Sequence, residues 1–226
     1  MTGGREVGFP PGGEVRDGQV YISALTHDTA EEAAALYTRV FLNDEPMTCR
    51  HGIDPARFLP FAREYLHFCA EQGLSIVAAD RGTDEVVGFA LCSDLATDWN
   101  AVSPGISTLL SLFGESMEIL GEVESRCPDL LNPEPGTVLH LFQLGVREAE
   151  RGRGIAICLV SSILSLALHR GYSRVIAECT GPGSRHICER CGFSGAAYVA
   201  YDDFVVNGQA FFAGISGGIT LMIRDL

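Results

Sequence analysis

Hydrophobic residues recur along the chain with the period of either a strand or a helix, and these periods predict the secondary structure. Alternation or short apolar runs, typical of strands, mark residues 20–25, 75–80, 86–93, 137–146, 173–179, 198–206 and 218–224. Helical periodicity marks residues 31–41, 54–72, 108–124, 155–169 and 184–190. Strands and helices therefore alternate, which predicts one mixed α/β (α+β) domain over residues 19–226.

Prolines and glycines separate these segments. Pro55 stands where a helix begins, and Gly73 and Gly171 follow the ends of helical segments. Pro46 ends the first predicted helix, because the residue before a proline is pushed out of the helical region. Residues 1–18 are rich in Gly and Pro and show little periodicity, which predicts an irregular N-terminal arm.

The composition is that of a folded, acidic protein. Of the 226 residues, 46% are hydrophobic and 20% are charged, and the formal net charge is −13. An acidic surface repels nucleic acids and anionic membranes, and it favours cationic molecules such as amines. The longest nearly apolar run, residues 155–168, is too short to cross a bilayer. We therefore expect a cytoplasmic protein that binds neither nucleic acid nor membranes.

The cysteines and histidines do not form a recognisable metal motif. The chain has eight cysteines but is not a short Cys-dense scaffold, so reduced, mostly buried thiols are favoured over disulfides. Cys188 and Cys191 form a lone C-x-x-C without the second pair that a structural zinc site needs. The histidines show no ligand spacing, so we predict no metal.

A glycine-rich turn lies between the strand at residues 137–146 and the most apolar helix. Its residues are Arg151, Gly152, Arg153, Gly154, Ile155 and Ala156. A helix N-terminus offers unpaired N–H groups to a phosphate, glycines let the backbone approach it, and arginines add charge and paired donors. The turn lacks the Lys of a P-loop and the third Gly of a Rossmann motif. A diphosphate cradle and an ordinary tight turn both fit this turn taken alone.

Together with its neighbours, the turn resembles the signature of the GNAT superfamily of N-acetyltransferases. Arg151-x-x-Gly154-x-Ala156 matches the family's (Gln/Arg)-x-x-Gly-x-(Gly/Ala), and Gly192-Phe193 matches its closing Gly-Phe. The strand before the turn ends in Leu144, Gly145 and Val146, in the place of the family's Leu-x-Val. The resemblance implies a central twisted mixed sheet of about seven strands flanked by helices, with a splayed strand pair forming the CoA cleft. It also implies that residues 144–146 and 151–156 bind acetyl-CoA, or another acyl-CoA, as co-substrate.

A narrower resemblance, to arylalkylamine N-acetyltransferases of the insect dopamine-acetylating type, rests on two short motifs. These are Asp-Glu-Pro at residues 44–46 and Cys-Thr-Gly-Pro-Gly-Ser at residues 179–184. The resemblance implies that Glu45 is the general base that deprotonates the amine. It also implies catalytic roles for the hydroxyl groups of Thr180 and Ser184.

Each candidate residue also has a simpler structural interpretation. Glu45 could cap a helix or lie in solvent, and Ser184 could be the N-cap of the helix at residues 184–190. Many superfamily members place a Tyr on the closing helix as general acid. The corresponding residue here is Cys188, which is either an acid or a packed core thiol. His140 could relay protons or belong to the core.

The sequence therefore predicts an N-acetyltransferase that moves an acetyl group from acetyl-CoA to the primary amine of a small molecule, by direct attack in a ternary complex. A non-catalytic acyl-CoA sensor is one alternative, and use of another acyl-CoA on a specialised metabolite or peptide amine is a second. The net charge of −13 disfavours a tRNA-dependent transferase. The apolar helix at residues 155–169 is compatible with a monomer or a homodimer.

Overall fold

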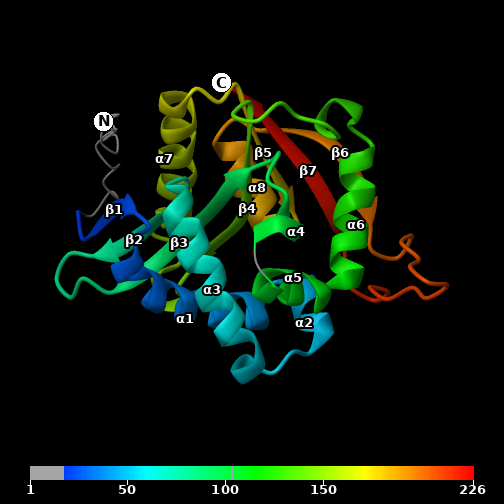
Figure 1. Cartoon of the computed structure of the whole chain (residues 1–226), viewed down its shortest axis with the longest axis horizontal. Helices are drawn as coiled ribbons and strands as arrows, with labels where there is room; N and C mark the ends of the chain where they lie inside the picture. Colours follow the sequence, from blue (N-terminus) through cyan, green and yellow to red (C-terminus); the bar gives the residue numbers. More distant parts are fainter. Residues whose placement is uncertain (1–17, 103) are drawn as a thin grey trace.

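The computed structural model describes residues 18–102 and 104–226 (Figure 1). Seven strands form one sheet in the order β1-β2-β3-β4-β5-β7-β6. Adjacent strands are antiparallel, except for the parallel pair β4 and β5. The strands are β1 (Val20–Ala24), β2 (Ile76–Asp80), β3 (Val86–Asp94), β4 (Val138–Val146), β5 (Arg174–Cys179), β6 (Ser194–Ala200) and β7 (Gly218–Asp225). The predicted mixed sheet is confirmed, and the predicted arm lies outside the described residues except for Gly18.

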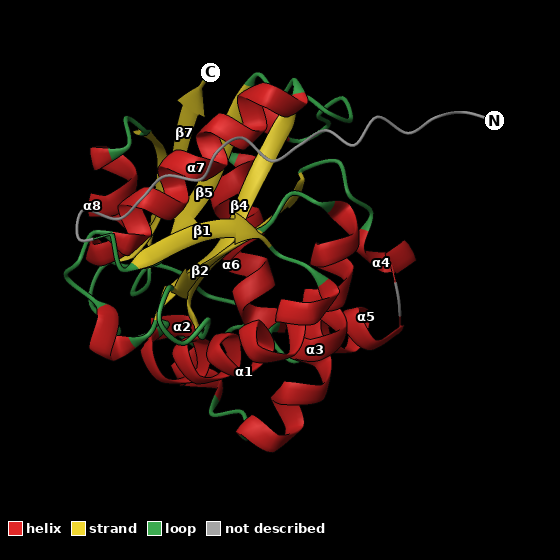
Figure 2. Ribbon diagram, turned by 90° about the vertical axis from the view of Figure 1, so that its left-hand side faces the viewer, coloured by secondary structure: helices red, strands yellow, loops and turns green. Residues whose placement is uncertain are grey.

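Helices cover both faces of the sheet, with α7 and α8 on one side of the strands and α1 and α3 on the other (Figure 2). Alternation in β2 explains this: Ile76 and Ala78 join the core under α7, whereas Val77 joins the core under α1 and α3. The helices are α1 (His27–Asp44), α2 (Pro46–His51), α3 (Pro55–Gln72), α4 (Trp99–Val102), α5 (Pro104–Ser111), α6 (Gly114–Ser125), α7 (Ile155–Arg170) and α8 (Pro182–Arg190).

Local capping chemistry sets several of these boundaries. Asp54 accepts a hydrogen bond from the Ala56 N–H and caps α3, and Gly73, with a φ of 63°, ends it. The extended backbone of Glu45 separates α1 from α2, a short helix that the sequence pattern does not predict. Both termini of the α3 segment therefore agree with the sequence prediction.

Three predicted elements differ from the structure. The helix predicted at residues 108–124 is two helices, because the non-helical backbone of Phe113 separates α5 from α6. The strand predicted at residues 198–206 has the wrong bounds: β6 runs over Ser194–Ala200 and a turn follows. The Tyr201 N–H still donates to the Gly217 carbonyl over 3.1 Å, and the Asp203 N–H then closes a turn on the Ala200 carbonyl over 3.3 Å. The hydroxyl of the buried Tyr201 donates to the Thr180 carbonyl over 2.7 Å. The helix predicted from Ser184 begins earlier, at Pro182.

The centre of the sheet is forked. β4 pairs with β5 only over Val138–His140, opposite residues 174–176, whereas it pairs with β3 as far as Val146. The β3–β4 register shifts opposite Leu91 and Cys92, which leaves Phe142 as the extra residue of a bulge. Beyond His140 the β5 side of β4 has no ladder partner among the described strands. The predicted splayed pair is therefore present, between β4 and β5.

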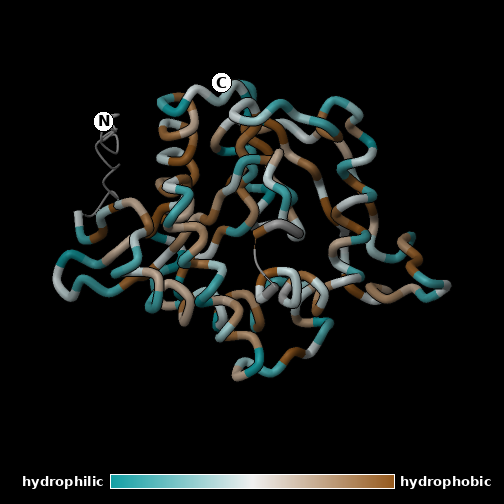
Figure 3. Tube along the Cα trace, in the orientation of Figure 1, coloured by the Kyte–Doolittle hydropathy of each residue, from teal (hydrophilic) through white to brown (hydrophobic). Residues whose placement is uncertain are grey.

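Hydrophobic residues concentrate in the sheet and in α7, whereas the turn between β2 and β3 is hydrophilic (Figure 3). All eight cysteines are free thiols. Among the described residues, no helix combines the length and the apolar character needed to cross a membrane.

Candidate active site

The turn before α7 forms an open cradle at one mouth of the β4–β5 fork. Gly152 and Gly154 have φ angles of 79° and 84°, in the left-handed region that other residues rarely adopt. A Cβ at either glycine would meet nothing within 4 Å, so the backbone conformation, not crowding, favours glycine. The first residues of α7 line a cavity here with both glycines, and their N–H groups belong to the unpaired set at a helix start. This cradle fits a diphosphate.

The two arginines of the turn have different surroundings. Arg151 lines the cradle cavity, donates from Nε to the Val146 carbonyl over 3.1 Å, and pairs through Nη2 with Asp44 over 2.5 Å. Arg153 pairs with Glu150 and is not among the described residues that line this cavity. The structure therefore brings Arg151, but not Arg153, to the predicted diphosphate site.

Leu144, Gly145 and Val146 of β4 line the same cavity. Close packing against Phe89 requires glycine at position 145, which the Leu-x-Val pattern of the sequence does not show. A Cβ at Gly145 would lie 2.3 Å from Cζ of Phe89, whose ring is fully buried against the strand. The unpaired edge of β4 and the cradle thus border one continuous groove.

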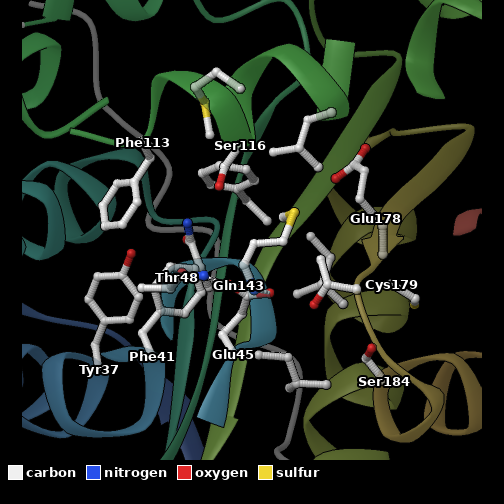
Figure 4. A pocket seen from close by; sticks show the side chains of 18 of the residues that line it. Tyr37, Phe41, Glu45, Thr48, Phe113, Ser116, Gln143, Glu178, Cys179 and Ser184 are labelled. Carbon is white, nitrogen blue, oxygen red and sulfur yellow. Dashed lines mark hydrogen bonds between the residues drawn. The ribbon is translucent and has the colours of Figure 1, made fainter. Parts of the chain in front are cut away.

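A second cavity, of about 130 Å³, extends from the fork towards α1, α5 and α6 (Figure 4). Its walls are mostly apolar and aromatic, with Gln143, Ser116 and Thr48 among the few polar residues. Apolar residues that shape it include Tyr37, Phe41, Trp99, Ile106, Phe113, Met117 and Leu120. We call this cavity the chamber.

The groove and the chamber meet at five residues that line both. They are Phe41, Glu45, Leu144, Thr180 and Ser184. The three residues predicted to be catalytic from the resemblance therefore all lie at this junction. They come from the α1–α2 connection, the end of β5 and the first turn of α8.

Glu45 is the N-cap of α2, so the capping role considered for it is confirmed. Its Oε1 accepts from the Met47 N–H over 3.1 Å, and its Oε2 accepts from the N–H and Oγ1 of Thr48 over 2.6 and 2.5 Å. A carboxylate has about four acceptor positions, so three occupied positions leave one for a further proton. These bonds also fix the carboxylate in one orientation.

Ser184 is not the N-cap of α8, because Gly181 holds that position. The Ser184 Oγ donates to the Gly181 carbonyl over 3.1 Å from within the first turn. This hydrogen bond orients the Ser184 hydroxyl at the junction. The capping of α8 does not depend on Ser184.

Cys188 is a packed core thiol. It is 2% exposed, and its Sγ lies 3.5 Å from that of Cys179. The hydrogen bond with Cys179 and burial raise the pKa of Cys188 far above the ordinary thiol range. A thiol in this state is a poor proton donor, which favours the structural interpretation of Cys188.

Three buried titratable groups, Glu124, His140 and Glu178, meet beside the chamber. The His140 Nε2 and Glu178 Oε2 lie 2.5 Å apart, and their side chains are 8% and 2% exposed. Burial lowers the pKa of His140, but the charge and hydrogen bond of Glu178 and the charge of Glu124 together outweigh it, and the net shift is upward. Burial, followed by the charge of Glu178, raises the pKa of Glu124 to about 7. Sequence reasoning missed this cluster because its members are far apart in the chain and come together only through the fold.

Comparison with known proteins agrees with this geometry. The "Acetyltransferase (GNAT) family" model matches residues 26–193. The C-terminal condensation domain of Ebony, solved with β-alanyl-dopamine, superposes with a TM-score of 0.77 at 16% identity, covering 92% of this chain and 99% of that one. No curated protein matches the sequence significantly.

Two acetyltransferases are similarly alike in structure. Arylalkylamine N-acetyltransferase 2 from Aedes aegypti has a TM-score of 0.75 at 18% identity, covering 91% of this chain and 98% of that one. The Drosophila melanogaster polyamine N-acetyltransferase that forms N-acetylagmatine has a TM-score of 0.68 at 19% identity, covering 92% and 100%. At these identities the likeness shows a shared fold. The matched family model covers most of the chain, and the protein belongs to the GNAT family of acetyltransferases.

Proposed function

We propose that this protein transfers the acetyl group of acetyl-CoA to the primary amine of a small molecule, by direct attack within a ternary complex. The observation that carries the proposal is the junction. Glu45, Thr180 and Ser184 line both the groove that ends in a diphosphate cradle and the chamber. A donor in the groove and an acceptor in the chamber would meet at these three side chains.

The donor half of the site rests on the cradle and the fork. The diphosphate would lie against Gly152, Gly154 and the start of α7. The guanidinium group of Arg151 adds a positive charge and paired N–H donors at the cavity wall. The free edge of β4 at residues 144–146 offers backbone groups to the pantetheine amides. Such backbone pairing positions the thioester along β4, with its carbonyl at the junction.

Glu45 acts as the general base in this proposal. An amine is mostly an ammonium ion at neutral pH, and its nitrogen must lose a proton before it attacks the thioester carbon. Glu45 is held rigidly by α2 and retains one acceptor position for that proton, directly or through a water molecule. Its fixed orientation suits a base that must reach one nitrogen.

Backbone N–H groups of β4 beyond the fork stabilise the oxyanion that forms on attack. Collapse of that intermediate breaks the C–S bond and releases CoA as a thiolate, which needs a proton. In this proposal the Ser184 hydroxyl rotates from the Gly181 carbonyl to donate a hydrogen bond to this sulfur, with the Thr180 hydroxyl at the same junction, and the thiolate takes its proton from solvent. Cys188 has no part in this step, since its thiol is paired with Cys179 in the core.

The chamber favours a compact acceptor with an apolar body. Its volume of about 130 Å³ is close to that of a cavity that holds one benzene molecule, about 150 Å³. Rings of Phe41, Phe113 and Trp99 line it. We therefore favour primary amines with a single aromatic ring or a short alkyl chain, in keeping with the amines named for the structural relatives.

The proposal is tested by following CoA thiol release with arylalkylamines, polyamines, amino acids, aminoglycosides and basic peptides as acceptors. Acetyl-CoA binding is measured in parallel by calorimetry, and a longer acyl-CoA serves as a second donor. We expect release with compact arylalkylamines or alkylamines and acetyl-CoA. Tight acetyl-CoA binding without release for any amine would instead identify a sensor, and preference for the longer donor would correct the acyl group.

A further inference from the structure

The cluster of Glu124, His140 and Glu178 joins three elements at the base of the fork. Glu124 is near the end of α6, and His140 is in the last β4–β5 ladder pair, opposite Ile176. Glu178 lies two residues beyond Ile176, on the same face of β5. One ligand atom from each of the three side chains lies within 4.8 Å of the other two.

The cluster holds an acceptor atom that the protein does not satisfy. The Glu178 side chain is 2% exposed, its Oε2 bonds to His140, and its Oε1 is buried without a hydrogen-bond partner among the described residues. A buried, unpaired carboxylate oxygen is strongly unfavourable. The Glu124 carboxyl packs against the same group, so two acidic side chains and one imidazole share a poorly hydrated space.

We propose that Glu124, His140 and Glu178 form a binding site for a divalent first-row transition-metal cation. Two carboxylates and one neutral imidazole carry a charge of −2, which such a cation balances. Carboxylate oxygens suit Mn²⁺, and an imidazole nitrogen extends the choice to Fe²⁺ and Zn²⁺. Metal–ligand bonds of about 2.1 Å place ligand atoms within about 4 Å of each other, which a small rotation of the carboxylates achieves.

The position of the site suggests a structural role. A bound cation would tie the end of α6 to both strands at the point where β4 and β5 separate. Leu120 and Met117 of α6 line the chamber, so the cation would also hold one chamber wall in place. None of the three side chains lines the groove, whereas Glu178 lines the chamber. It departs from the prediction of no metal, which rested on sequence spacing alone.

Mn²⁺ is the probe for this site, because thiols such as those of the eight cysteines bind it weakly. Untagged full-length protein is stripped with EDTA, and bound Mn²⁺ is then counted by electron paramagnetic resonance and by calorimetry. We expect one ion per chain and a higher melting temperature with Mn²⁺. Glu124→Gln keeps the size of the side chain and should weaken binding by at least about tenfold. Glu118→Gln is the matched control, since Glu118 lies on the exposed face of the same helix.

The melting temperature of each variant without metal shows whether it folds. A Glu124→Gln protein that melts like the wild type without metal, yet gains no stability from Mn²⁺, supports the site. His140→Gln provides a second variant on another element with the same expectation. Failure of the wild type to bind Mn²⁺ overturns the proposal. So does binding that Glu124→Gln leaves intact, or that Glu118→Gln abolishes.

Discussion

Arg151 and Asp44 form an ion pair, with 2.5 Å between Nη2 and Oδ2, that links the turn before α7 to the last residue of α1. The next residue along the chain is Glu45. The pair therefore couples the cradle proposed for the donor to the residue proposed as base. Both side chains are 43% exposed, so a phosphate can reach the guanidinium without rearrangement of the fold.

Replacing Arg151 by Gln should raise the KM for acetyl-CoA by about ten- to hundredfold, because one charge-assisted hydrogen bond contributes about 1.5–3 kcal/mol. Arg153→Gln is the control and should have a smaller effect, since Arg153 pairs with Glu150 and does not itself line the cavity. Steady-state kinetics with varied acetyl-CoA measures both. A larger effect at Arg153 would reverse the assignment of the two arginines.

Gly145→Ala should destabilise the fold by about 1–3 kcal/mol, the range for overpacking a buried site. The added methyl group would lie 2.3 Å from Cζ of Phe89, which must move within the core. Gly121→Ala is the matched control, since a Cβ there meets nothing within 4 Å and alanine favours the helix. Urea unfolding compares the two. Partial rescue of Gly145→Ala by Phe89→Leu is expected, and an undiminished defect would locate the clash elsewhere.

His51 should make the protein less stable as the pH falls. Burial lowers the pKa of His51 below 6.5, although the charges of Glu115 and Glu45 oppose the shift. The unfolded chain then binds the proton more readily than the folded one. The contribution of His51 to stability is therefore complete above about pH 6.5 and is lost as the pH falls towards the lower folded pKa.

This pH dependence is measured by urea unfolding at about pH 7.5 and about pH 5.5. The loss of stability on acidification should be smaller in His51→Gln than in the wild type. His169→Gln, which changes an exposed histidine of α7, should behave like the wild type. An equal loss in the wild type and in His51→Gln would refute the role assigned to His51.

Ser184→Ala should lower kcat by about tenfold or more, because a hydrogen bond to the leaving sulfur is lost. Cys188→Ala should keep kcat within about threefold, because its thiol is buried and paired with Cys179. Melting temperatures show whether the buried substitution damages the fold. The opposite ranking in kcat would make Cys188 the proton donor.

The sequence predicts the parts of this fold whose signals are local. Asp54 and Gly73 mark the ends of α3 through capping and a left-handed glycine, and both act within a few residues. Residues 151–156 predict a diphosphate cradle because the turn and the start of the helix are contiguous in the chain. The family resemblance also predicted the splayed strand pair, which the structure confirms.

Features set by distant contacts escape the sequence pattern. The hydrophobic pattern predicts a strand at residues 198–206, but the bounds of β6 depend on its pairing with β7, and a turn begins at Tyr201. The Glu124–His140–Glu178 cluster depends on the packing of α6 against the sheet, which brings Glu124 to side chains of β4 and β5. Likewise, no local pattern predicts that Glu45 and Ser184 lie close together, because they are far apart in the chain. Only the family resemblance placed both in one site.

Glu45→Gln tests the central claim most directly. Glutamine keeps one oxygen that can accept from the α2 backbone but cannot take up the amine proton, and Thr48→Val, which removes one hydrogen bond to Oε2, controls for disturbed capping. The measurement is kcat across the pH range with the best acceptor, with acetyl-CoA affinity from calorimetry. We predict a fall in kcat of about 10²–10⁴-fold for Glu45→Gln at unchanged acetyl-CoA affinity, and a small change for Thr48→Val. A Glu45→Gln enzyme with the wild-type rate at every pH would contradict the account.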